Sequence, residues 1–243
     1  GDISAKEGWR IAVSLIWQNM GNLEKTLDTI RKLGLCTDQE AKVLVTMAQR
    51  KINAVTSTSA GRLFDGVSAI LGIRRASTFE GEASTALEFA AEAWRKQREM
   101  QKKNPEENLK IRMSEKEDIP ESTGISEASE DERKFILNTG EIVAYLVRAR
   151  LAGENPGKLA YGFHRARADE ILAACEEAER QTGIRKVALS GGVFQNRLLL
   201  ELVDDGLTEM GFKVLKHSLI PPNDGGIALG QAVYGMAYVQ RHR

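Results

Sequence analysis

The stretch at positions 186–203, KVALSGGVFQNRLLLELV, carries residue types that could hold an anionic ligand. An apolar run predicts a strand that ends at Ser190; Gly191 and Gly192 follow, and Asn196 stands where a helical pattern begins. Adjacent glycines let the backbone approach a ligand closely, and free N–H groups at a helix start favour negative charge. Asn196 could then reach a base or a sugar. A tight strand-to-helix turn that needs glycine only for its backbone angles is an equally open alternative.

A second glycine turn, PPNDGGIALGQA, places the carboxylate of Asp224 beside Gly225 and Gly226. A carboxylate next to two residues without side chains suits a metal ligand or a nucleotide contact. The pattern alone favours the simpler alternative, a helix start capped by Asn223 or Asp224.

A third turn, STSAGRLFDG, contains Gly61 and, four residues later on the same helical face, Asp65. Gly61 permits close backbone approach. The alternative for Asp65 is a solvent-facing carboxylate on an amphipathic helix.

Other chemistries have little support in the sequence. His164, His217 and His242 share no metal-ligand spacing, and neither a Ser/His/Asp order nor a Gly-Lys-Ser/Thr phosphate loop is present. Cys36 and Cys175 are too few for a disulfide scaffold, Cys175 fits a small buried residue, and neither suggests a nucleophile, which fits a reducing cytosol. Lys+Arg and Asp+Glu both total 34, so nothing demands a nucleic-acid surface. No apolar run reaches the ~20 residues of a membrane span.

In the first hundred positions, helical periodicity predicts a series of helices, which must position the candidate site residues in that part of the chain. The expected helices cover 5–20, 23–34, 37–52, 59–73 and 80–104. Gly34 is expected to end the second helix, and Thr37 with Glu40 to form a capping box at the third. The charged segment 104–131 is predicted to be a mobile loop.

Strand and helix patterns alternate after this segment. Strands are expected at 133–139, 186–190 and 212–218, and helices at 140–153, 158–183, 195–211 and 221–240. Three strands are few for an open α/β sheet, so either the domain is mostly helical or part of its sheet is missing. The predicted fold class is α/β, a helix-rich lobe with a small sheet. The predicted domains are a helical part at 1–103, the loop at 104–131 and an α/β part at 132–243.

Four segments taken in order resemble one family. TSAGRLFDGVSAILGI, TFEGEAS, LSGGVFQNRLLLE and PPNDGGIALGQA are similar to the C-terminal part of the threonylcarbamoyl-transferase-like domain of the hydrogenase-maturation carbamoyltransferases, the HypF family. The opening GDISAKEGWRIAVSLI also resembles the entry into that region. The resemblance covers nearly the whole chain except 104–131.

The resemblance implies an actin/sugar-kinase/Hsp70-like ATPase fold and a group-transfer activity. Members of the family make carbamoyl-adenylate from carbamoyl phosphate and ATP. They pass the carbamoyl group to the C-terminal cysteine of a partner protein, HypE, on the route to the cyanide ligands of [NiFe]-hydrogenase. A cytoplasmic location is therefore expected.

The resemblance also implies which residues touch the nucleotide: Gly61, Asp65, Gly81, Gly191, Gly192 and Asn196. Asp65 matches a position that contacts the ribose, and Gly81 matches a backbone contact with the nucleotide. Gly191, Gly192 and Asn196 match a loop that contacts the phosphate and adenosine. Asp224 matches a metal-binding aspartate for a divalent ion (iron, zinc or magnesium). The family completes this metal site with a His-x-x-x-His pair from a preceding lobe, which this sequence lacks.

The missing His pair, the absent upstream domains of the family and the first residue Gly1 predict a piece of a larger enzyme that folds at least in part but does not turn over alone. No catalytic residue is identified. Three other functions are left open: a small-molecule O-carbamoyltransferase, a sugar-kinase-like phosphotransferase, and a non-catalytic module that docks a partner protein.

Overall fold

The computed structural model describes residues 2–102, 125–127, 135–137 and 139–242. The chain packs as two compact units, Gly1–Ala174 and Cys175–Arg243. The division falls within helix α9 (Pro156–Thr182), and the domains expected at 1–103, 104–131 and 132–243 stay a prediction. Each unit is described by itself.

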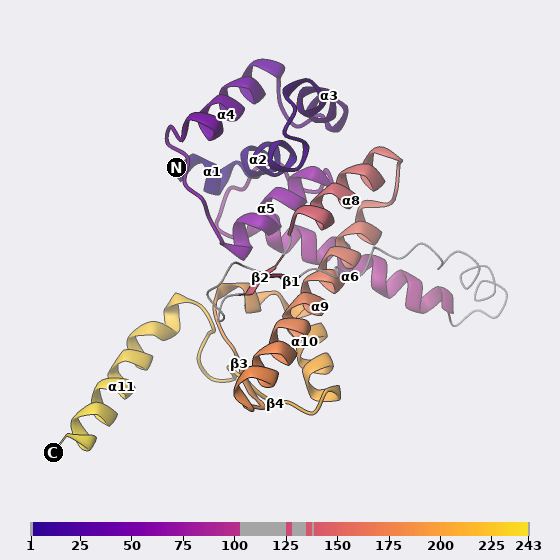
Figure 1. The fold of residues 1–243 in the computed structure, drawn as a ribbon. Helices are drawn as coiled ribbons and strands as arrows, with labels where there is room; N and C mark the ends of the chain where they lie inside the picture. Colours follow the sequence, from indigo (N-terminus) through magenta and orange to yellow (C-terminus); the bar gives the residue numbers. More distant parts are fainter. Residues whose placement is uncertain (1, 103–124, 128–134, 138, 243) are drawn as a thin grey trace. The chain divides into compact units, whose positions relative to one another are not determined.

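The first unit is built mainly of helices (Figure 1). They are α1 (Asp2–Lys6), α2 (Gly8–Met20), α3 (Leu23–Leu33), α4 (Asp38–Arg50), α5 (Ala60–Ile70), α6 (Glu82–Lys102), α8 (Thr139–Leu151) and most of α9. The helix predictions are confirmed, except that the first predicted helix is interrupted at Glu7.

Two short strands, β1 (Ile125–Glu127) and β2 (Phe135–Leu137), pair antiparallel in the same unit. β2 lies within the strand predicted at 133–139. β1 falls inside the segment 104–131 that was predicted to be a loop; the other residues of that segment lie outside the described residues.

Helix α5 lies at the centre of the first unit and packs against α2, α6 and α8. Every residue from Phe64 to Leu71 is buried, so the helix has no solvent face over this span. Gly66 allows the closest approach, because a Cβ there would lie 2.7 Å from Leu15 Cδ1. Full burial of a side chain such as Phe64 contributes about 1.5–3 kcal/mol. The helix that carries Gly61 and Asp65 is therefore held rigidly.

The predicted helix ends at the α3–α4 connection are confirmed. Gly34 ends α3 in the left-handed conformation at φ 65°. At the start of α4, Thr37 N–H donates to Glu40 at 2.9 Å and Glu40 N–H donates to Thr37 Oγ1 at 3.3 Å, which is the capping box.

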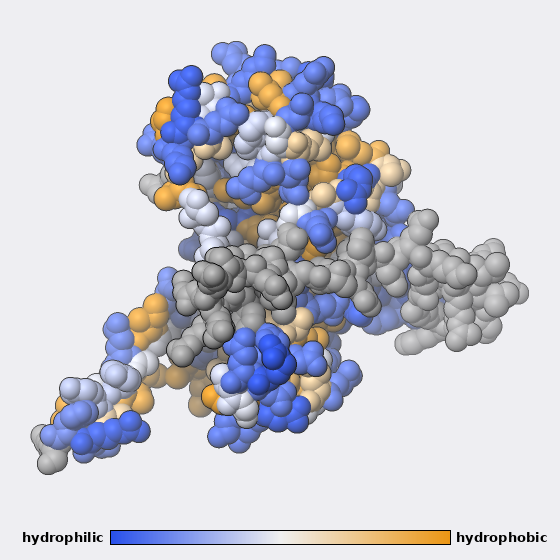
Figure 2. Space-filling view, viewed as in Figure 1, coloured by the Kyte–Doolittle hydropathy of each residue, from blue (hydrophilic) through white to orange (hydrophobic). Residues whose placement is uncertain are grey.

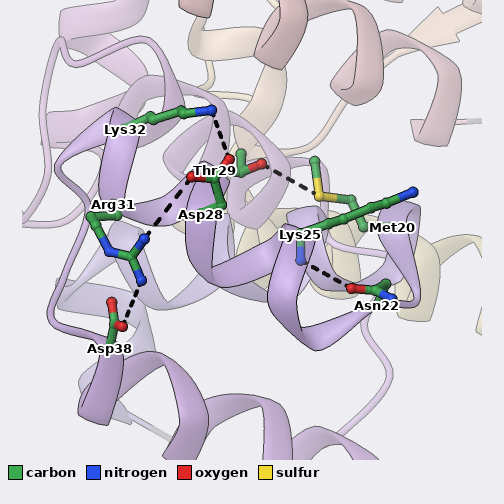
Figure 3. Close-up of polar contacts among 8 residues, drawn as sticks. All are labelled: Met20, Asn22, Lys25, Asp28, Thr29, Arg31, Lys32 and Asp38. Carbon is green, nitrogen blue, oxygen red and sulfur yellow. Dashed lines mark hydrogen bonds and ion pairs between the residues drawn. The ribbon is translucent and has the colours of Figure 1, made fainter.

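Side chains around α3 complete this corner of the unit (Figure 3). Asn22 Oδ1 accepts from Lys25 N–H at 3.0 Å and caps α3. Arg31 joins α3 to α4 through an ion pair of 2.7 Å with Asp38, and this pair lowers the pKa of the Asp38 carboxyl. Because both partners are exposed, the pair orients the corner more than it stabilises it.

The second unit has a strand–helix–strand core. It contains β3 (Lys186–Leu189), the short 3-10 helix η1 (Gly192–Gln195), α10 (Arg197–Glu209), β4 (Lys213–Lys216), η2 (Asp224–Gly226) and α11 (Ile227–Arg241). β3 and β4 are parallel, in a register that pairs Lys186 with Lys213 and Leu189 with Lys216. The buried apolar residues of this unit are Leu189, Leu198, Leu199, Val203, Leu207 and Phe212.

Helix α11 and strand β4 leave apolar side chains uncovered. No residue of α11 is buried, and the exposed fractions of Val233 and Tyr234 are 58% and 73%. Leu215 of β4 is exposed as well. In Figure 1 α11 extends away from the β3–β4 pair, and Figure 2 shows hydrophobic and hydrophilic residues mixed along it. Parallel sheets are normally covered on both faces. The described second unit thus presents surface of a kind that proteins usually bury.

Among the described residues, no helix combines the length and apolar character needed to cross a bilayer.

Candidate functional site

The turn after β3 requires one of its two glycines for its backbone. Gly191 has φ 96° and ψ 159°, a conformation that residues with a side chain rarely adopt. Gly192 has no such requirement, because its φ is not positive and a Cβ placed there would meet no atom within 4 Å. The backbone-angle alternative therefore explains Gly191 but leaves Gly192 unexplained.

Asn196 has a structural role at the start of α10. It is buried, and its Oδ1 accepts from Leu199 N–H at 2.8 Å as the helix cap. This hydrogen bond anchors the end of the 190–196 turn to α10.

The turn before α11 is capped by Asn223 rather than by Asp224. Asn223 Oδ1 accepts from Gly225 N–H at 3.1 Å, while Asp224 is exposed. Gly226 is needed for packing, since a Cβ there would lie 2.8 Å from Pro221 O. The capped-helix interpretation thus accounts for Asn223 and the glycines, and it assigns no structural contact to the Asp224 carboxylate.

The two glycine turns of the second unit lie side by side. Gly191 N–H donates to Pro222 O at 2.8 Å, which joins the 190–196 turn to the 221–226 turn. Both turns follow the carboxyl ends of the parallel strands β3 and β4 (Figure 1). Ligands of α/β folds collect at this edge of a sheet. Gly191, Gly192, Asn196 and Asp224 are thus carried by two turns joined at one end of the second unit.

Gly61 and Asp65 lie on α5 in the first unit. Asp65 is only 4% exposed, so the solvent-facing alternative is wrong. The reason is the packing of α5 on all sides: even the backbone of Asp65 is covered, since a Cβ on Gly8 would lie 2.8 Å from its carbonyl oxygen. Burial raises the pKa of the Asp65 carboxyl, and the ion pair with Arg62 at 3.2 Å opposes this shift. Little of this carboxylate's surface is available to a ligand.

Gly81 forms the turn into α6. Its φ of 80° is left-handed, and its carbonyl oxygen accepts from Ser84 Oγ and Thr85 N–H, both at 2.9 Å. Thr78 N–H donates to the Glu82 carboxylate beside it, which lowers the pKa of that carboxyl. Gly81 is therefore required by the turn itself.

A polar pair beside the two glycine turns of the second unit was not predicted from the sequence. Ser190 Oγ and His217 Nε2 are 2.9 Å apart, although the residues are 27 positions apart in the chain. The available signal was positional: Ser190 and His217 stand at or next to the ends of the strands predicted at 186–190 and 212–218.

Neither cysteine is arranged as a nucleophile. Both are free and partly buried, so the prediction of a buried Cys175 is only partly met. Burial raises the pKa of both thiols, that of Cys36 to about 11. A thiol in this state is protonated at neutral pH and reacts slowly.

The described residues do not form a metal site by themselves, because no group of three or more His, Cys, Asp or Glu side chains converges among them. Asp224 offers a single exposed carboxylate. One carboxylate does not complete a coordination shell.

The helix-rich fold, with a small parallel sheet and glycine turns at its carboxyl edge, has the arrangement of a ligand-binding α/β domain. Residues 1–231 match the family described as "Carbamoyltransferase, Kae1-like Domain, second subdomain", and the chain belongs to this family. The resemblance to HypF proteins and the predicted actin/sugar-kinase/Hsp70-like fold class are thereby confirmed.

Named relatives agree with this assignment. The chain is 28% identical to the "Probable carbamoyltransferase HypF" of Methanocaldococcus jannaschii over 242 residues, which cover 100% of this chain and 27% of that protein. It is 30% identical to "Carbamoyltransferase HypF2" of Cupriavidus necator over 234 residues, 95% of this chain and 28% of that protein. The chain thus spans little more than a quarter of the length of these two relatives.

Solved structures share the fold. A crystal structure of full-length HypF "in the phosphate- and nucleotide-bound form" superposes with a TM-score of 0.73 at 28% identity, covering 96% of this chain and 26% of that one. The crystal structure of T. kodakarensis HypF gives a TM-score of 0.74 at 21% identity, covering 99% and 28%.

Proposed function

We propose that this chain is the part of a HypF-type enzyme that holds carbamoyl-adenylate while its carbamoyl group is transferred to the C-terminal cysteine of a HypE-like partner. The family membership supports the carbamoyl chemistry, and the nucleotide-bound HypF relative supports an ATP-derived ligand. The observation that carries the proposal is the hydrogen bond from Gly191 to Pro222, because it unites the two glycine turns at the ligand-binding edge of the sheet.

In this proposal the phosphate lies over Gly191 and Gly192. The open space above Gly192 supports this position, since the fold itself gives no reason for a missing side chain there. Asn196 borders the adenosine, and its bond to Leu199 N–H holds the turn in place. Preorganised backbone groups of this kind stabilise the charge that develops on the departing AMP.

Residues of the first unit are proposed as further nucleotide contacts: Gly61, Asp65 and Gly81. For Asp65 the contact involves the small exposed part of its carboxylate beside Arg62.

Asp224 is proposed as one ligand of a divalent metal ion, with the remaining ligands supplied from outside this chain. Its exposure and the lack of a structural contact for its side chain in the Asn223-capped turn support this role. Because the described residues do not complete the shell, we derive no step of the reaction through the ion.

Nucleotide binding tests the phosphate position. We expect AMP and ATP to bind the chain in isothermal titration, and Gly192→Ala to weaken binding about tenfold because the new methyl group occupies ligand space. Gly230→Ala is the matched control, since a Cβ there also meets no atom within 4 Å but lies on α11. If wild-type protein bound neither nucleotide, even together with the rest of its natural polypeptide, the proposal would fail.

Group transfer tests the activity. The full natural polypeptide is supplied with carbamoyl phosphate, ATP and a partner protein ending in cysteine, and the thiol is analysed by mass spectrometry for one added carbamoyl group. Asp224→Ala is expected to reduce transfer by at least tenfold while leaving the fold intact, because the residue is exposed. Unchanged transfer in this variant would exclude the metal role.

The uncovered surface of α11 and β4 favours a second, additional role in docking. We propose that other domains of the same polypeptide cover this surface, since the HypF relatives are much longer proteins of which this chain spans only 27–28%. Hydrogen exchange of α11 in the natural polypeptide is the test: amides as fast as those in this chain alone would contradict the docking role.

A further inference from the structure

The side chains of Ser190 and His217 meet at the carboxyl edge of the β3–β4 sheet. The strand register pairs Leu189 with Lys216, so the next residues of the two strands stand opposite each other. Ser190 Oγ lies 2.9 Å from His217 Nε2, within hydrogen-bond distance, and both residues are exposed. The pair is therefore built by the sheet and is open to a ligand.

Open space adjoins this pair. Gly191 follows Ser190 directly, and a Cβ on Gly191 or Gly192 would meet no atom within 4 Å. The hydrogen bond from Gly191 to Pro222 holds the neighbouring turn in place. The pair thus borders the space in which the proposed function puts the departing phosphate.

Among the described residues, few charged groups lie on the elements next to the Ser190–His217 pair at the carboxyl edge of the β3–β4 sheet. Lys216 precedes His217 and is ion-paired with Asp204 of α10, and Asp224 lies on the adjoining turn. Since the ammonium of Lys216 is paired with a carboxylate, it does not stand as a lone positive charge next to the imidazole.

We propose that His217, oriented by Ser190, accepts the proton that the acceptor thiol loses during carbamoyl transfer; this inference rests on the proposed function. In this proposal the imidazole is in the tautomer in which Nε2–H donates to Ser190 Oγ, 2.9 Å away, so that the lone pair of the ring lies on Nδ1. Imidazole suits this task because it is the side chain that changes charge closest to neutral pH.

The bonds and protons balance without a further reactant. The S–H bond of the acceptor breaks and its proton moves to His217 Nδ1, while sulfur forms a bond to the carbamoyl carbon. The bond from that carbon to the adenylate phosphate oxygen breaks, and its electron pair stays on the phosphate. The imidazolium then returns its proton to water. His217 is in this account a catalytic residue, and Ser190 a positioning residue.

The test compares His217→Ala, Ser190→Ala and the control His242→Ala in the full natural polypeptide. His242 is also exposed, and its Nδ1 lies 2.8 Å from Tyr238 O on α11. We expect AMP affinity and circular dichroism to stay as in wild type for all three variants. Transfer should fall on the order of 100-fold in His217→Ala, less in Ser190→Ala, and not in the control.

Two readouts separate proton transfer from a merely structural role. Added imidazole should restore transfer to His217→Ala but not accelerate wild type, and the rise of the wild-type rate with pH should disappear in His217→Ala. In Ser190→Ala the transfer rate should still rise with pH, but over a different pH range than in wild type.

Each other outcome has a defined meaning. If wild type transfers and His217→Ala transfers equally well, or is not restored by imidazole, the inference is overturned while the proposed function stands. A carbamoyl group trapped on Ser190 would make the serine a nucleophile and also overturn it. If wild type transfers no carbamoyl group to a thiol, the proposed function fails and takes the inference with it.

Discussion

His164 is predicted to make the stability of the first unit depend on pH. Its side chain is fully buried on α9, where Nδ1–H donates to Ala160 O at 2.7 Å. The ring packs edge-on against Phe64 at 5.3 Å between centroids and against Phe163 at 6.0 Å. This burial lowers the pKa of His164 from 6.5 to about 4.

The lowered pKa of His164 decides whether acid stabilises or destabilises the first unit. Because the folded pKa is depressed, the unfolded chain binds a proton at His164 before the folded chain does as the pH falls. Stability is therefore complete above about pH 6.5 and is lost progressively toward pH 4. With these two pKa values, going from about pH 7 to about pH 5 removes on the order of 2 kcal/mol.

Urea unfolding of wild type and His164→Asn at both pH values measures this effect. All three tryptophans, Trp9, Trp17 and Trp94, lie in the first unit, so their fluorescence reports its unfolding alone. Asparagine does not titrate, so the variant, although less stable at pH 7, should lose about 2 kcal/mol less than wild type on acidification.

The exposed His242→Asn is the control and should keep the wild-type pH dependence. Equal losses in wild type and His164→Asn between the two pH values would refute the reasoning.

Three further predictions concern single features of the fold. Thr37→Ala removes one half of the capping box and should lower the unfolding free energy by about 1 kcal/mol in urea titration; no change would mean that the box does not stabilise α4. Gly66→Ala places a methyl group 2.7 Å from Leu15 Cδ1 and should destabilise the first unit by roughly 1–3 kcal/mol, and a melting temperature equal to wild type would contradict this packing. Replacing both Val233 and Tyr234 by Ser should leave stability within about 0.5 kcal/mol but reduce self-association in light scattering, because these side chains are exposed; a large loss of stability would show that they are buried.

The helices could be predicted from the sequence because their signals are local. Apolar spacing placed the helices to within a few residues, and Thr37 and Gly34 marked ends that depend only on neighbours in the chain. The strand β1 was missed because three residues in a charged segment give no periodic signal.

Properties that depend on tertiary packing could not be predicted. The sequence pattern of its own helix is compatible with a surface position for Asp65. Only the packing of α5 against α2, α6 and α8 buries this residue. The Ser190–His217 pair depends on the register of two strands separated by α10, which no local pattern specifies. The glycine turns were recognisable as motifs, but the difference between Gly191, which the backbone needs, and Gly192, which it does not, required coordinates.

The hydrogen bond from Gly191 N–H to Pro222 O couples the two loops at the sheet edge. A ligand that displaces either loop must strain or break this hydrogen bond. A ligand bound at one loop therefore changes the binding free energy of a ligand at the other loop. Linkage makes that effect reciprocal. If the proposed anion and cation bind these two loops, each changes the affinity for the other through the carbonyl oxygen of Pro222, which no side-chain substitution removes.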